Sequence, residues 1–229
     1  MKLPRFTLYL LIVLLIAASF WLLKPQPSDD VARAPMILTP WDISVHENAT
    51  SSVLGLQLET DTLATAIRQL GNDFEIAIIS NSRDSSALEV YFSHFAAGPI
   101  QAKLILGIGA TREQLERMQT NAQNVAITSS GSRKYRLDSE GLALAMQLKI
   151  ISLTLIPAAQ LNPDILRDRF GSPADTVVIN ENESHWLYPD RGLDISLHKR
   201  GKEVLQYVAP GSFERIAAPL HSAESQASE

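Results

Sequence analysis

The sequence contains no cysteine, and this absence excludes several kinds of stabilisation and chemistry. Without cysteine the chain cannot form the disulfides that hold many small exported domains together. It also cannot carry the acylated cysteine of a bacterial lipoprotein, and a zinc site would have to rely on histidines and carboxylates. Stability must therefore come from a hydrophobic core, which a chain of 229 residues is long enough to build.

Recognisable catalytic and metal-binding motifs are also missing. The five histidines show no spacing typical of metal ligands, and only His185 and His198, on neighbouring predicted strands, are placed to approach each other. There is no Gly-x-Ser-x-Gly sequence, and Gly107-Ile-Gly109 lacks the third glycine of a dinucleotide-binding loop. We therefore predict no catalytic residues, no bound metal and no cofactor.

Positive charge is in deficit as well. The chain has 20 basic residues against 25 acidic ones, a formal net charge of −5 at pH 7. This balance argues against nucleic acid or an anionic lipid surface as the main partner. Two small basic clusters stand out against it, one at Arg133, Lys134 and Arg136 and one at residues 198–202, and either can meet an acidic surface on a partner.

The amino-terminal part of the chain is strongly apolar. Residues 6–23, from Phe6 to Leu23, carry no charge and would span roughly 27 Å as a helix, close to the thickness of a bilayer. Lys2 and Arg5 precede this run, which predicts a cytoplasmic amino end. We therefore predict a transmembrane anchor over residues 1–23 and a single-pass protein of the inner membrane with a periplasmic domain.

A cleaved secretory signal is the alternative interpretation of this segment. Ala17-Ala18-Ser19 offers small residues at which a signal peptidase can cut. Cleavage there would leave Phe20-Trp21-Leu22-Leu23 as an apolar new terminus, which favours an uncleaved segment. The prolines and acidic residues of 24–40 then predict an extended tether, and the small polar residues of 217–229 predict a disordered tail.

Between tether and tail, the pattern predicts an α+β fold of short helices packed on antiparallel sheets. Residues 41–150 form a first module, in which a helix ending near Gly71 precedes three strands and a helical connection. Residues 151–216 form a second module, in which Asn162 caps a helix from Pro163 to Phe170. Each module places a helix and a glycine before three or more strands, which suggests two duplicated α-β-β-β units; a shared C-cap glycine of purely local origin is the alternative.

The second module resembles a known family. The residues concerned are Phe170-Gly171-Ser172-Pro173, Trp186-Leu187-Tyr188, the run 193–197 and the turn at Gly201. Together they are similar to the domain of the small outer-membrane assembly lipoproteins SmpA, OmlA or BamE. The resemblance covers about sixty residues and implies a helix packed on an antiparallel meander. The chain departs from the family because it lacks the acylated cysteine.

The best candidates for a functional surface are residues for interaction. Trp186 and Tyr188 alternate on one predicted strand and so share a face, which either packs on the helix 163–170 or is offered to a partner. Arg200 and Lys202 belong to the second basic cluster, at a predicted turn. These four residues are our candidate interaction set.

The sequence therefore predicts a non-enzymatic, membrane-anchored periplasmic protein. We expect it to act as an interaction or scaffold module in envelope biogenesis, held at the inner membrane by Phe6–Leu23 and bound to an envelope protein. One alternative is an envelope hydrolase built from dispersed acids such as Asp84, Glu89 and Asp194. Another is an extracytoplasmic sensor whose apolar strands enclose a ligand.

Overall fold

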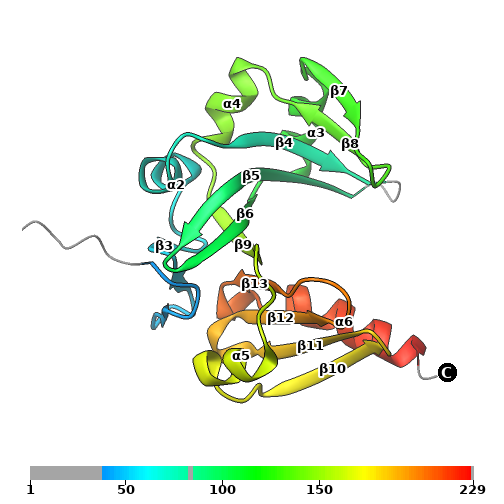
Figure 1. The fold of residues 1–229 in the computed structure, drawn as a ribbon. Helices are drawn as coiled ribbons and strands as arrows, with labels where there is room; N and C mark the ends of the chain where they lie inside the picture. The colour runs from blue at the N-terminus through cyan, green and yellow to red at the C-terminus, as the bar shows by residue number, and fades with distance from the viewer. Residues whose placement is uncertain (1–37, 82–84, 228–229) are drawn as a thin grey trace, which may run out of the picture. The chain divides into compact units, whose positions relative to one another are not determined.

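A computed structural model describes residues 38–81 and 85–227 of the chain, and Figure 1 shows its elements. Most of the regular structure in these residues is β-strand. The strands form one sheet of three strands and one of ten. The fold is therefore mostly β, and the predicted α+β architecture of small α-β-β-β modules is wrong.

The ten-stranded sheet consists of two meanders that meet on a shared strand. The first meander contains β4 (Glu75–Ser80), β5 (Ser86–Ala97) and β6 (Ile100–Ile108). The second contains β10 (Asp175–Asn180), β11 (Glu183–Tyr188), β12 (Leu193–His198) and β13 (Val204–Val208). Strand β9 (Ile150–Pro157) pairs with β6 on one side and with β13 on the other.

This shared strand is the reason that the two-module prediction fails. The predicted border between residues 150 and 151 falls inside β9, which belongs to both meanders at once. A hairpin of β7 (Asn124–Ile127) and β8 (Arg133–Arg136) extends the sheet beyond β4. The complete order is β10-β11-β12-β13-β9-β6-β5-β4-β8-β7, with every neighbouring pair antiparallel.

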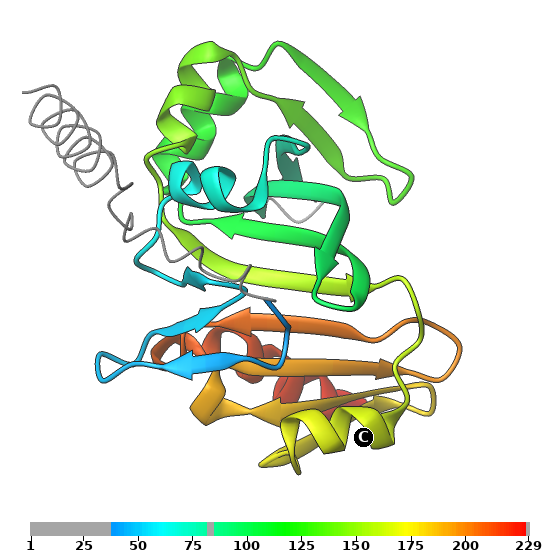
Figure 2. The same cartoon turned by 60° about the vertical axis from the view of Figure 1, so that its left-hand side comes forward.

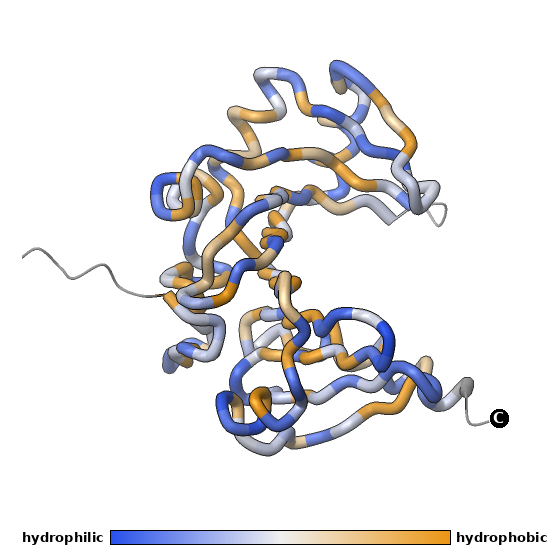
Figure 3. Tube along the Cα trace, in the orientation of Figure 1, coloured by the Kyte–Doolittle hydropathy of each residue, from blue (hydrophilic) through white to orange (hydrophobic). Residues whose placement is uncertain are grey.

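One face of the ten-stranded sheet carries the main hydrophobic core. Leu155 of β9 lies opposite Leu104 of β6 and Leu205 of β13, and all three are fully buried. Four helices contribute buried side chains to the same core: α2 (Leu63–Leu70), α3 (Arg112–Thr120), α4 (Ser139–Ala145) and α5 (Pro163–Phe170). Figure 3 shows the alternation of apolar and polar residues along the strands that makes this arrangement possible.

The small sheet packs into this core as well. Its strands are β1 (Ile43–Val45), β2 (Ser51–Val53) and β3 (Leu56–Gln57). Just before it, the hydroxyl of Tyr207 donates a hydrogen bond of 2.8 Å to the carbonyl oxygen of Pro40. The last residue of the predicted tether 24–40 is therefore attached to the folded core, whereas residues 24–37 lie outside the described residues.

The opposite face of the second meander is covered by a helix that the sequence analysis did not predict. Helix α6 (Glu214–Ala227) packs Ala217, together with Phe213 just before it, against Val177, Leu187 and Val208. Helices α5 and α6 thus lie on opposite faces of β10–β13 (Figure 2). The predicted disordered tail 217–229 is helical as far as residue 227, because its apolar residues recur at helical spacing and have a sheet face to cover.

No helix in residues 38–81 or 85–227 is both long and apolar enough to cross a membrane. The longest described helix, α6, has 14 residues and measures about 21 Å, short of a bilayer's hydrocarbon core. This finding contradicts the predicted fold with a transmembrane helix and the predicted single-pass location in the inner membrane with a periplasmic domain. The segment Phe6–Leu23, on which those predictions depended, lies outside the described residues.

Candidate functional site

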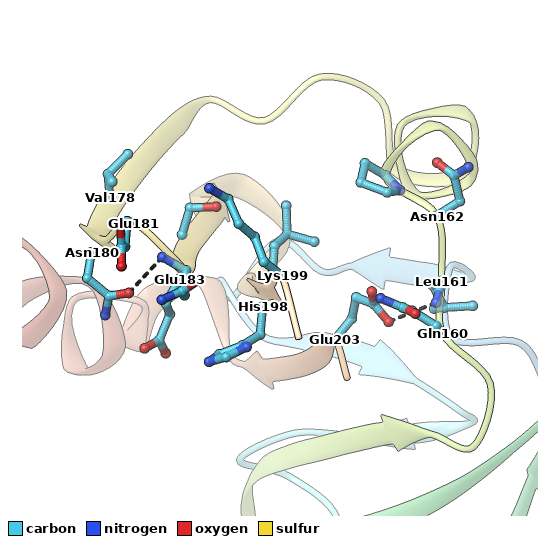
Figure 4. A pocket seen from close by; sticks show the side chains of 14 residues that line it. Gln160, Leu161, Asn162, Val178, Asn180, Glu181, Glu183, His198, Lys199 and Glu203 are labelled. Carbon is cyan, nitrogen blue, oxygen red and sulfur yellow. Dashed lines mark hydrogen bonds between the residues drawn. The ribbon is translucent and has the colours of Figure 1, made fainter. Parts of the chain in front are cut away.

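A cleft opens in the second meander, between the start of α5 and two strand turns. Its volume is about 830 Å³, and its walls come from the loop before α5, the β10–β11 turn and the β12–β13 turn (Figure 4). The apolar part of the lining is Leu161, Pro163, Val178 and Leu197. The size lies within the range of sites that bind a small molecule or a few residues of a peptide.

Local signals in the sequence shape the α5 side of the cleft. The Asn162 side chain accepts a hydrogen bond of 2.8 Å from the Asp164 amide, and Pro163 occupies the first helical turn, where no amide proton is needed. The Glu203 carboxylate accepts a hydrogen bond of 2.8 Å from the Leu161 amide. Because Glu203 is only 4% exposed, this bond fixes the loop before α5 to the start of β13.

Acidic groups outnumber basic ones on the cleft wall. Glu181, Glu183 and Glu203 line it, against Lys199 and the half-buried His198. Glu181 and Lys199 are exposed, so both can rearrange when a ligand binds. The cleft therefore combines an apolar floor with a rim that carries Glu181 and Glu183 opposite Lys199, and the two carboxylates suit an apolar ligand that carries a cationic group.

A buried ionisable pair lies behind the cleft. Nδ1 of His185 lies 2.9 Å from Oδ2 of Asp194, and Nε2 lies 3.5 Å from Oε1 of Glu183, which itself lines the cleft. Burial lowers the pKa of His185, but the hydrogen bonds and charges of Asp194 and Glu183 raise it by more, so the net pKa is raised. The Glu183 carboxylate, which lines the cleft, is thus linked through the His185 imidazole to the buried Asp194 carboxylate.

Two of the four candidate interaction residues are buried under α5. Trp186 and Tyr188 are each 5% exposed. The guanidinium of Arg167 lies 4.5 Å from the Trp186 ring centre, the Phe170 and Tyr188 ring centres are 6.2 Å apart, and the Tyr188 hydroxyl donates a bond of 2.9 Å to the Gly171 carbonyl. Of the two alternatives for this aromatic face, packing on the helix is the one that the structure has.

The other two candidates lie beside the cleft. Arg200 and Lys202 are exposed in the β12–β13 turn, between the cleft residues Lys199 and Glu203. The Lys202 ammonium donates a hydrogen bond to the Ala158 carbonyl, so part of its charge supports the loop that follows β9. The structure therefore divides the candidate set into a buried pair and a surface pair.

The residues considered for a metal site and for a hydrolase do not form a common site in the described part of the chain. His185 lies opposite Ser196 and His198 opposite Glu183, which makes the two histidines diagonal neighbours on β11 and β12. The His185 ring contacts Asp194 and Glu183, whereas the His198 ring accepts a hydrogen bond from the Arg200 amide. In the part of the chain that the structure describes, no three histidine or acidic side chains gather in a way that could hold a metal ion.

Two of the three dispersed acids proposed for a hydrolase, Glu89 and Asp194, are also far apart. Asp84 lies outside the described residues. Glu89, on β5, is partly buried, and burial raises its pKa. Asp194, on β12, is four strands away across the sheet, about 19 Å at the usual strand spacing.

Sequence reasoning did not find the cleft or the His185–Asp194 pair. One signal was available for the pair, because Asp194 interrupts the apolar residues Leu193 and Ile195 and must point to the opposite sheet face. The cleft had no such signal, because its walls are about forty residues apart along the chain at Leu161 and Glu203.

Comparison of the chain with family models, with curated proteins and with solved structures finds no match. These comparisons do not identify a domain of the SmpA, OmlA or BamE type, and the resemblance of the second module, residues 151–216, to it stays a prediction.

Proposed function

We propose that this protein is a non-enzymatic interaction module that binds a short, extended segment of a partner protein in the cleft beside α5. The segment combines apolar side chains with a lysine or arginine. The observation that carries the proposal is the composition of the cleft: an apolar floor that includes the exposed Val178, and a rim with Glu181 and Glu183. Apolar contacts supply affinity in such a site, and the charged rim selects the partner.

The chemistry of the lining supports binding more than catalysis. All lining residues are described, and none of their hydroxyl groups is hydrogen-bonded to a histidine in the way that nucleophilic catalysis requires. Glu203 already accepts the Leu161 amide, so it has a structural role. The resemblance of this region to a family of assembly proteins is consistent with an interaction role.

The test uses two blocked pentapeptides and two matched variants. We expect acetyl-Leu-Lys-Val-Arg-Leu-amide to bind and its Glu-containing counterpart to bind at least tenfold more weakly, because the carboxylates of Glu181 and Glu183 line the cleft. Val178→Lys should weaken binding of the cationic peptide at least tenfold. Ile165→Lys is the control, since Ile165 and Val178 are 50% and 52% exposed but only Val178 lines the cleft.

Binding is followed by amide chemical shifts in full-length protein. Equal affinity for the two peptides, equal effects of the two variants, or shifts located away from residues 160–163 and 178–184 would overturn the proposal.

A small amphipathic ligand is the second candidate, favoured by the cleft volume of about 830 Å³. A fragment screen distinguishes it. Compounds that shift the amides of Val178 and Leu197, in a protein that binds neither peptide, would assign the cleft to a small molecule.

A further inference from the structure

The two edge strands of the ten-stranded sheet, β10 and β7, differ in how their outward backbone groups are hydrogen-bonded. At the β10 edge, the Thr176 amide donates to Oδ1 of Asp175 at 2.7 Å, and the Val178 amide donates to Oε1 of Glu224 in α6 at 3.1 Å. Side chains therefore satisfy donors that would otherwise be open to another strand. Such protection is what folded proteins normally give to a sheet edge.

The β7 edge has no such protection. The Thr128 amide donates to the Ser132 carbonyl at 2.8 Å, and the β7–β8 register continues from this pair through Ala126 and Lys134. Because hydrogen-bonded and non-hydrogen-bonded pairs alternate in an antiparallel ladder, the backbone groups of Val125 and Ile127 point away from β8. No residue of the described chain makes a hydrogen bond to them.

The side chains of β7 also lack the usual deterrents to strand addition. The strand Asn124–Ile127 contains no charge and no proline. Val125 and Ile127 share one face of the strand and are 51% and 79% exposed, the latter being the most exposed large apolar side chain described. An added strand with apolar side chains on that face would cover both residues.

The other face of β7 selects the charge of the added strand. A cavity of about 650 Å³ lies beside it, lined in part by Ala126, Lys134 and Arg136 and also by the carboxylates of Glu75 and Asp138, the latter of which accepts the Gly141 amide. Lys134 is paired with Glu75, whereas Arg136 lies near enough to Glu75 to help lower the pKa of its carboxyl but makes no direct ion pair with a described residue. Ala126 is small, so a glutamate opposite it can reach across β7 towards Lys134 and Arg136, about 10 Å away.

From these observations we propose that β7 is a second binding site, at which an extended segment of a partner protein adds an eleventh strand. The segment alternates apolar side chains, which cover Val125 and Ile127, with acidic ones, which face Lys134 and Arg136. A second copy of the chain is a poorer occupant, because β7 itself has no acidic side chain that could face Lys134 and Arg136. This site is separate from the cleft, and it takes a segment of opposite charge.

The test uses blocked hexapeptides of alternating glutamate and valine, with the lysine and valine version as the charge control. Fluorescence anisotropy should show saturable binding of the glutamate peptide and at least tenfold weaker binding of the lysine peptide. Val125→Pro removes an outward amide, which an edge strand tolerates, and should reduce binding at least tenfold. Arg136→Glu should reverse the preference between the two peptides.

Two further measurements keep the test independent of how well a variant folds. A glutamate peptide that is N-methylated at alternate residues cannot complete the ladder and should not bind wild-type protein. Binding that survives this methylation would overturn the proposal, as would equal affinity for the two charges. Sedimentation of wild-type protein tests whether a second copy of the chain occupies the edge. A dimer that dissociates in the Val125→Pro variant would assign the edge to a second copy.

Discussion

His185 and Asp194 form an ionisable pair on the sheet face that also carries Val177 and Leu187. The two side chains are 10% and 5% exposed, so their charges are held largely away from water. Buried pairs of this kind contribute little when complete but cost several kcal/mol when one partner is removed. The pair therefore links the stability of the second meander to the protonation of one imidazole.

This link predicts a pH dependence with a definite sign. The pKa of His185 is raised above its ordinary value of 6.5, so the charged form stabilises the fold. That stabilisation is complete below about pH 6.5 and is lost as the pH rises through the folded-state pKa. We expect the free energy of unfolding, measured in urea, to fall as the pH rises through this window, and His185→Gln to flatten the fall.

His94→Gln is the control, because His94 is exposed and its ring is hydrogen-bonded to the neighbouring Ser93 hydroxyl. It should leave the pH profile as in wild type. A profile that His185→Gln does not change would contradict the assignment of the charge to this pair.

At the scale of elements, the sequence predicted those helix boundaries that depend on neighbouring residues. Helix α5 begins and ends where expected, because Asn162, Pro163 and Gly171 act on their immediate neighbours. Trp186 and Tyr188, predicted to alternate on one strand, both lie on β11. Helix α6 was missed, because its composition is that of a tail and its stability depends on apolar contacts with Val177 and Leu187, strands away.

Two substitutions in helix α5 test which of its side chains attach it to the rest of the fold. Phe170 is 2% exposed and packs against Tyr188, so Phe170→Ala should lower the free energy of unfolding by about 3–5 kcal/mol. Ile165→Ala on the same helix removes a side chain that is 50% exposed and should change it by about 0.5 kcal/mol or less. Thermal or urea unfolding measures both, and similar losses would mean that α5 is not docked through Phe170.

At the scale of the whole described chain, strand order was beyond prediction for a physical reason. Hydrophobic alternation tells which residues of β9 face the core, but it does not tell which strands lie beside them, since β6 and β13 present equally apolar partners. The cleft shares this non-local origin, because the Leu161–Glu203 bond exists only once β13 is paired with β9. A further contact joins distant segments, with Arg169 of α5 lying 4.6 Å from the Trp41 ring centre.

A shared central strand predicts that the two meanders unfold together. Leu155 is fully buried between Leu104 and Leu205, so Leu155→Ala should lower the stability of both meanders by the same amount, about 2–5 kcal/mol. In a chain with Trp21→Phe and Trp41→Phe, fluorescence of Trp186 reports the second meander, and hydrogen exchange of β5 amides reports the first. Both probes should give one transition that shifts as a unit, whereas Val125→Ala at the exposed β7 edge should move neither. Two separate transitions, or a Leu155→Ala effect on one probe alone, would instead support independent domains on either side of residue 150.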